Sequence, residues 1–174
     1  MRALAVASLI VAALAGCGGG GGGTTDAAAT GTAGTGGAAA GKLLTWKENG
    51  MAHAALVASA ARVKSATSDI VQVSGGEASG TALSFGVAVQ PPTLAAGTYT
   101  FNGGTGYPIV SMSYGVGGVS SSIPTAISIV FTALGDTTGS HAVGTFTATL
   151  PFGDGTTKTI TDGRFDLALT VNSI

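Results

Sequence analysis

Residues 144–171 read GTFTATLPFGDGTTKTITDGRFDLALTV, and they carry the clearest sign of the fold. Apolar residues alternate with Thr or other polar residues from Phe146 to Leu150, and again from Phe165 to Val171. A period of two is the signature of a β-strand with one buried and one exposed face. The Gly-Asp-Gly within 152–156 is typical of a hairpin turn. The stretch therefore predicts paired strands whose Phe146 and Phe165 rings point inward.

The same alternation recurs upstream, in segments that turn residues such as Asn49-Gly50, Gly75-Gly76 and Pro91-Pro92 bring to an end. We expect further strands at 43–48, 70–73, 83–89, 98–101, 110–114 and 127–132. About eight short strands with one apolar face each predict an all-β fold. Two architectures satisfy this pattern, an antiparallel β-sandwich or a partly open barrel.

Two segments leave a choice open. Residues 51–66 are rich in Ala, so we expect an irregular or strand-like crossing, with a short helix as the alternative. Ile160 and Phe165 are both large and apolar, yet a regular strand would place them on opposite faces. Asp162-Gly163 can restore the parity through a bulge with a left-handed glycine, or it can form a two-residue hairpin. We favour the bulge, because residues 152–156 already supply a turn.

The N-terminus has the layout of an export signal. Arg2 precedes an apolar run over residues 3–15, which is shorter than the 20 or so residues of a membrane span. Leu14-Ala15-Gly16-Cys17 resembles the lipobox of bacterial lipoproteins at all four positions. The resemblance implies transfer of diacylglycerol to the Cys17 thiol and cleavage between Gly16 and Cys17. Residues 1–16 are then a lipoprotein signal peptide.

A tether and one domain follow the signal. Residues 17–41 begin with the lipidated Cys17 and continue almost entirely as Gly, Ala and Thr, so we expect a disordered, flexible tether. Its mean reach would be roughly 25–30 Å. Residues 42–174 form the β-domain. Cys17 is the single cysteine of the chain, so the domain has no internal disulfide and depends on its core.

Several motifs of the domain resemble a broad group of uncharacterised β-rich bacterial lipoproteins. These proteins carry an early Asn-Gly turn and a Gly-Thr-Tyr strand, here at 49–50 and 97–99. They end in a Gly-Thr-Phe strand and a Thr-Ile-Thr-Asp-Gly-x-Phe strand, here at 144–146 and 159–165. The resemblance implies the fold and the envelope location, and it brings no activity with it.

The residues that could carry chemistry are few. His53 and His141 are candidate metal ligands only if Glu48, Asp69 or Asp136 converges on them, and no ligand spacing is present. Asp136, Asp154 and Asp162 stand beside Gly or Thr, as turn aspartates do. Four aromatic residues offer a possible sugar-stacking platform: Trp46, Tyr99, Tyr107 and Tyr114. For Trp46 and Tyr99 the alternative is a position in the core or at its rim.

Charge and composition narrow the function. The chain has 7 Lys and Arg against 8 Asp and Glu, so it lacks the basic face that nucleic-acid binding needs. We expect no cofactor and no metal. The expected protein is a lipid-anchored, non-catalytic envelope module whose partner is the membrane, with an envelope protein or a glycan as a further partner.

Two alternatives have their own criteria. A carbohydrate- or small-ligand-binding domain would show an exposed aromatic patch. A small hydrolase would show a cleft with His53 or His141 beside two carboxylates. Gly18 stands where some bacteria read an Asp as an inner-membrane retention signal, so we expect the outer membrane in a host with two membranes.

Overall fold

The structure is a computed structural model that describes residues 42–90 and 93–174. In these ranges the chain is all-β, as predicted. Its eleven strands are β1 (Lys42–Glu48), β2 (Met51–Ala54), β3 (Val57–Lys64), β4 (Asp69–Gly76), β5 (Ala82–Val89), β6 (Gly97–Thr100), β7 (Ile109–Val116), β8 (Val119–Ser120), β9 (Ala126–Leu134), β10 (His141–Pro151) and β11 (Thr157–Ser173). No helix of these ranges is long and apolar enough to cross a membrane. The signal peptide, Cys17, the tether and Pro91-Pro92 lie outside the described residues.

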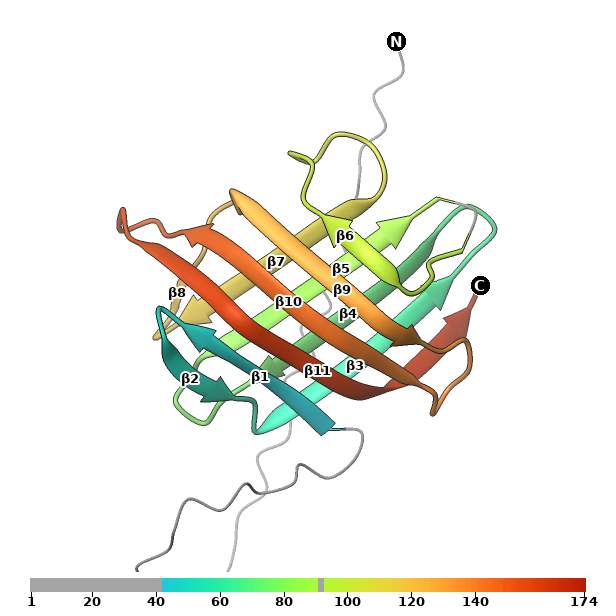
Figure 1. Cartoon of the computed structure of the whole chain (residues 1–174), viewed down its shortest axis with the longest axis horizontal. Coiled ribbons are helices and arrows are strands. Elements are labelled where there is room, and N and C mark those ends of the chain that lie inside the picture. The colour runs from blue at the N-terminus through green and yellow to red at the C-terminus, as the bar shows by residue number, and fades with distance from the viewer. Residues whose placement is uncertain (1–41, 91–92) are drawn as a thin grey trace, which may run out of the picture. The chain divides into compact units, whose positions relative to one another are not determined.

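All strands belong to one curled sheet that stays open (Figure 1). The order along it is β6-β9-β10-β11-β3-β4-β5-β7-β8, and the β1-β2 hairpin branches off β11. The 17-residue strand β11 makes the curl possible. Its first part lies between β10 and β1, and its last five residues pair with β3. The β11-β3 pairing is parallel, so the expectation of a wholly antiparallel sheet is wrong at this one pair.

The Ala-rich segment 51–66 contains the whole of β2 and β3, so the strand-like crossing that we expected is correct and the helical alternative is wrong. Ala60 and Arg62 of β3 point into the protein, and the residues between them face outward. Alanine suits either face and favours helices by propensity. Pairing with β4 on one side and β11 on the other overrides that propensity here.

A bulge interrupts β11 at Asp162-Gly163, as predicted, and the hairpin alternative is wrong. The strand runs unbroken through this point, while its register against β10 shifts between Phe146 and Ala148. The shift lets Ile160 and Phe165 both face the core, where each is almost fully buried. One detail of the prediction is wrong: Asp162, with φ 51°, takes the left-handed conformation in place of Gly163. Asp is one of the few residue types that tolerate it.

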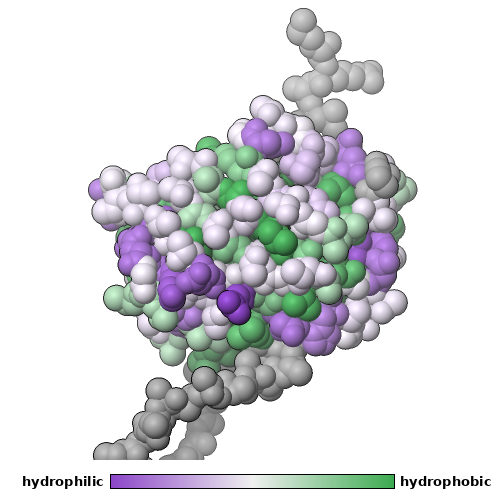
Figure 2. Space-filling view, in the orientation of Figure 1, coloured by the Kyte–Doolittle hydropathy of each residue, from purple (hydrophilic) through white to green (hydrophobic). Residues whose placement is uncertain are grey.

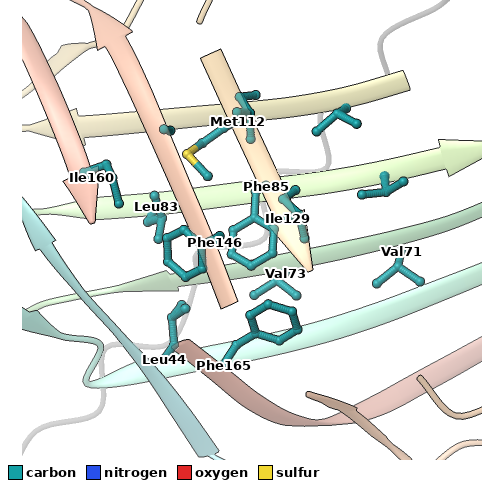
Figure 3. Close-up of a cluster of buried hydrophobic side chains, with 14 of the residues drawn as sticks. Leu44, Val71, Val73, Leu83, Phe85, Met112, Ile129, Phe146, Ile160 and Phe165 are labelled. Atoms are coloured by element: carbon teal, nitrogen blue, oxygen red, sulfur yellow. The ribbon is translucent and has the colours of Figure 1, made fainter. Parts of the chain in front are cut away.

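Three Phe rings from three strands occupy the centre of the core (Figure 3). The Phe85 ring of β5 lies 4.6 Å from Phe146 of β10 and 5.3 Å from Phe165 of β11, centroid to centroid. These tilted contacts join the two halves of the curled sheet. The inward direction that alternation predicted for Phe146 and Phe165 is therefore confirmed.

The Phe residues of β10 and β11 lie over glycines of the facing strand. Gly144 pairs with Phe165, and Phe146 pairs with Gly163, so two Gly-x-Phe motifs interlock head to tail. A β-carbon at Gly163 would come within 2.7 Å of the Phe146 ring, and one at Gly144 within 2.6 Å of the Phe165 ring. Each glycine leaves the space that the opposite ring fills, which explains why these motifs occur as a pair.

Candidate functional site

The densest group of ionisable and aromatic side chains surrounds the β1-β2 hairpin. We call it the His53 cluster, and its members are Trp46, Glu48, His53, Glu77, Tyr114 and Lys158. The two-residue turn Asn49-Gly50 builds it, with φ of 48° and 88°. Two left-handed residues are the mark of the type I′ hairpin turn. This turn places His53 directly opposite Trp46.

His53 is held on three sides. Its ring stacks on Trp46, at 5.4 Å between centroids and 7° between planes. Its Nδ1 lies 3.1 and 3.2 Å from the two carboxylate oxygens of Glu77, and because an ionised carboxylate only accepts, Nδ1 carries the hydrogen. Its Nε2 is buried without a hydrogen-bond partner, 3.8 Å from Glu48 Oε2.

Glu48 is the second anchor of the cluster. Lys158 Nζ lies 2.6 Å from Oε1, and the Tyr114 hydroxyl donates to Oε2 at 2.7 Å. The Trp46 indole N–H in turn donates to the Tyr114 oxygen at 3.4 Å. These contacts tie β1 to β7 and to β11, and they use both oxygens of the carboxylate.

The surroundings shift the ionisation of the cluster. Burial acts to raise the pKa of Glu48, but the hydrogen bonds from Lys158 and Tyr114 outweigh it and hold that pKa below its usual value. For Glu77, burial is likewise outweighed by hydrogen bonds from His53, the Ala54 amide and Ser79, so its pKa is also lowered. Burial and the bond to Glu48 raise the pKa of Tyr114. At neutral pH both carboxylates are therefore ionised and Tyr114 is neutral.

His53 thus lies beside two carboxylates, Glu48 and Glu77, although residue spacing in the sequence did not predict this. The three side chains are packed against each other and largely shielded from solvent. The side chains of His53, Glu48 and Glu77 expose 13%, 12% and 19% of their surface. A hollow in the surface lies elsewhere, on the outer face of β4, β5 and β7. A hydrolase would need an open cleft at a histidine beside two carboxylates. The His53 cluster has these residue types, but the hollow does not lie at them.

The hollow on the outer face has a volume of about 270 Å³. Gly86 is one of its lining residues, and a β-carbon there would come within 3.0 Å of the Val71 carbonyl and 3.8 Å of the Ser111 hydroxyl oxygen. No charged residue is among the residues that line it. It can offer serine hydroxyls and the Gln72 amide to a ligand, and no general acid or base.

Asp69 and Asp136, considered as metal ligands, bind Arg62 instead. Arg62 is 1% exposed, and its guanidinium makes a two-pronged contact with Asp69 at 2.9 and 2.6 Å. Its remaining N–H groups reach the carbonyls of Leu94 and Gly135 and the carboxylate of Asp136. The guanidinium thus makes four hydrogen bonds and a second ion pair, and these contacts fasten the segments at 94 and 135–136 to β3 and β4.

The other sequence candidates take local roles. His141 lies 2.5 Å from Asp166 on the partly exposed face of β10 and β11. Asp154 accepts from the Thr156 amide at 2.9 Å, the turn role expected of it. Asp162 pairs with Lys47 at the surface. Across residues 42–90 and 93–174, no three His, Cys, Asp or Glu side chains form a group that could hold a metal.

The aromatic residues form no sugar-stacking platform. Trp46 and Tyr114 are 2% and 1% exposed, so they belong to the core. Tyr99 bonds through its hydroxyl to the carbonyl of Ala95, and Tyr107 alone is largely exposed, at 45%. The possible platform does not form, because the inner face of β1 and β7 takes Trp46 and Tyr114. The alternative of a position in the core or at its rim is correct for Trp46, which is in the core, and for Tyr99, which packs against it.

Sequence reasoning missed Glu77 and Lys158 as members of the cluster. One signal was present: the Asn49-Gly50 turn predicts a hairpin, and a hairpin puts His53 opposite Trp46. No local signal could bring Lys158 of β11 or Glu77, which follows β4, to the same place.

Comparison with family models, curated proteins and solved structures finds no match to this chain. The fold and the site therefore define its class by themselves: an all-β, curled-sheet domain with a closed, ion-paired cluster at one hairpin.

Proposed function

We propose that the protein is a lipid-anchored component of the cell envelope with a non-catalytic binding or structural module. The observation that carries the proposal is the match of Leu14-Ala15-Gly16-Cys17 to a lipobox, directly after an apolar run of signal-peptide length. Cleavage after Gly16 would leave Cys17 as the lipidated first residue. Two or more acyl chains anchor a protein stably, where one chain does not. The membrane is then its first partner, and in a host with two membranes the protein would reside in the outer one.

The packing of the ionisable groups supports a non-catalytic role. Glu48, Glu77 and Asp69 each hold hydrogen-bonding partners from other strands or loops. A general acid or base must reach a substrate proton, and groups already engaged in packed contacts are poorly placed to do so. The domain is then a partly open barrel, in which the His53 cluster and the Arg62–Asp69 ion pair hold strands and loops together.

A ligand-binding role is the second candidate, and the hollow at Gly86 favours it. The hollow is uncharged and lined partly by serine hydroxyls, which suits a neutral polar ligand such as a glycan or a peptide segment of an envelope protein. Titration of Gly86→Ser, which would add a side chain to the lining of the hollow, against wild type with envelope glycans tests it. Equal binding by the two proteins would remove this candidate.

Lipidation is tested by metabolic labelling with palmitate and by detergent phase partition. Wild-type protein should carry the label and enter the detergent phase. Cys17→Ser should lose both and remain as precursor or soluble protein, because serine lacks the thiol that accepts the diacylglycerol. Gly20→Ser, which leaves residues 14–17 intact, is the matched control. Processed, detergent-bound Cys17→Ser protein would refute the anchor.

A further inference from the structure

The corner between β2 and β3 exposes two large aliphatic side chains side by side in sequence. Leu56 is 75% exposed and Val57 is 69% exposed. The backbone gives them little freedom to turn inward, because the Leu56 amide donates to the Gly76 carbonyl at 2.9 Å and Val57 pairs with Gly76. The exposure is thus built into the fold.

The surface around this pair consists of small, uncharged residues, with the Glu77 carboxylate at its border. Gly76 pairs with Val57 on one side and with Ala82 on the other, so small residues continue the surface across β4 and β5. The nearest carboxylate, Glu77, is engaged with His53 and the Ala54 amide. We call the group Ala54, Leu56, Val57, Gly76 and Ala82 the corner patch. It is a neutral surface with an aliphatic centre.

The corner patch lies where the N-terminal part of the chain joins the domain. The Ala55 amide donates to the Leu44 carbonyl at 2.9 Å, two residues after β1 begins at Lys42. Figure 1 places the starts of β1 and β3 at the same lower edge of the domain, and Figure 2 shows hydrophobic surface at that edge. A lipid on Cys17 would therefore hold the bilayer within reach of this edge.

We propose that the corner patch docks on the lipid surface that holds the anchor, with Leu56 and Val57 inserted among the acyl chains. The proposal rests on the proposed function, since it needs the lipidated Cys17. It fixes an orientation: β3 begins at the membrane, and its other end, where the Ile174 amide donates to the Lys64 carbonyl, faces away from it.

Because the tether keeps the domain close to the bilayer, two aliphatic side chains are sufficient for docking. Residues 18–41 can span at most about 85 Å when fully extended. A domain confined within that distance of the bilayer experiences an effective concentration of the order of 1 mM, so docking is an intramolecular step. Because the corner patch is neutral, its contact should depend little on salt or on anionic lipid.

The test uses the full lipidated chain in phosphatidylcholine vesicles, with and without bromine on the acyl chains. Leu56→Trp adds a reporter to the corner patch, whereas Trp46 is buried and sets the baseline. Ile174→Trp is the matched control, since Ile174 is 87% exposed and lies beside Lys64, at the end of β3 opposite Val57. We expect the emission added by Leu56→Trp to be lost in brominated vesicles, at low and high salt, and the emission added by Ile174→Trp to persist.

The possible failures are distinguishable. If the wild-type chain does not float with the vesicles, the anchor is wrong and the proposed function fails with it. If the protein floats but the Leu56→Trp emission persists, the anchor stands and the docking is overturned. Persistent emission that soluble iodide cannot quench would assign the corner patch to a protein contact, and equal bromine quenching of both variants would refute the orientation.

Discussion

At the scale of residues, the interlocked Gly-x-Phe motifs decide how closely β10 and β11 can pack. Gly144 is buried beneath the Phe165 ring and beside the Val130 carbonyl, and a β-carbon there would clash with both. Gly144→Ala should therefore destabilise the domain by about 1–3 kcal/mol, the usual cost of overpacking a core. Gly153→Ala is the matched control, because its β-carbon would meet nothing within 4 Å. Urea denaturation of the two variants measures the difference; equal midpoints would mean that the strands move apart freely.

At the scale of elements, carboxylates fasten the β1-β2 hairpin and the start of β4. The folded pKa values of Glu48, Glu77 and Asp69 lie below the ordinary 4.5, 4.5 and 3.8. A lowered pKa gives stability that is complete above the unfolded value and is lost as pH falls through the folded one. We expect a melting temperature that is level from pH 7 to about 5 and falls steadily below about pH 4.

The variant Glu77→Gln measures how much of this loss of stability in acid comes from the contacts of Glu77 with the β1-β2 hairpin. The variant should melt lower than wild type at pH 7, since Gln cannot hold His53 and the Ala54 amide as an ionised carboxylate does. The two proteins should converge as the pH falls through the folded pKa of Glu77, because the protonated side chain then carries no charge. Asp162→Asn, at an exposed pair with Lys47, should change little. Melts that stay equally far apart at every pH would contradict the ionic role of Glu77.

At the scale of the whole molecule, composition divides the chain near Lys42. A segment of Gly, Ala and Thr exposes its backbone to a protease, and paired strands do not. Brief digestion with a broad-specificity protease should therefore cut within residues 18–41 and leave a resistant fragment from about Lys42 to the C-terminus, as mass spectrometry would show. Protection of 18–41 in the isolated protein would mean that the segment docks on the domain.

Much of the architecture could be predicted because it depends on neighbours in the chain. Alternation is local, so the eight expected strands, the inward Phe146 and Phe165 and the bulge after Ile160 could all be read from it. For the Ala-rich segment the sequence favoured a strand-like crossing without giving the bounds of its strands. Alanine is compatible with either face, so the strands depend on pairing with their neighbours. The parallel pairing of β11 with β3 could not be predicted either, because it joins two segments that are far apart in the chain.

The candidate site was the least predictable part. Its members come from β1, β2, β7, β11 and the segment after β4, and nothing in the local sequence says that these will meet. The sequence alone determined that the domain is all-β, which residues line its core, and that the first 17 residues have the form of a lipoprotein signal. Only the tertiary structure decided that His53 joins Glu48 and Glu77, that Arg62 takes Asp69 and Asp136, and that Leu56 and Val57 stay at the surface. Strand formation follows from the order of polar and apolar neighbours, whereas contacts across the sheet follow from a pairing order that sequence distance does not encode.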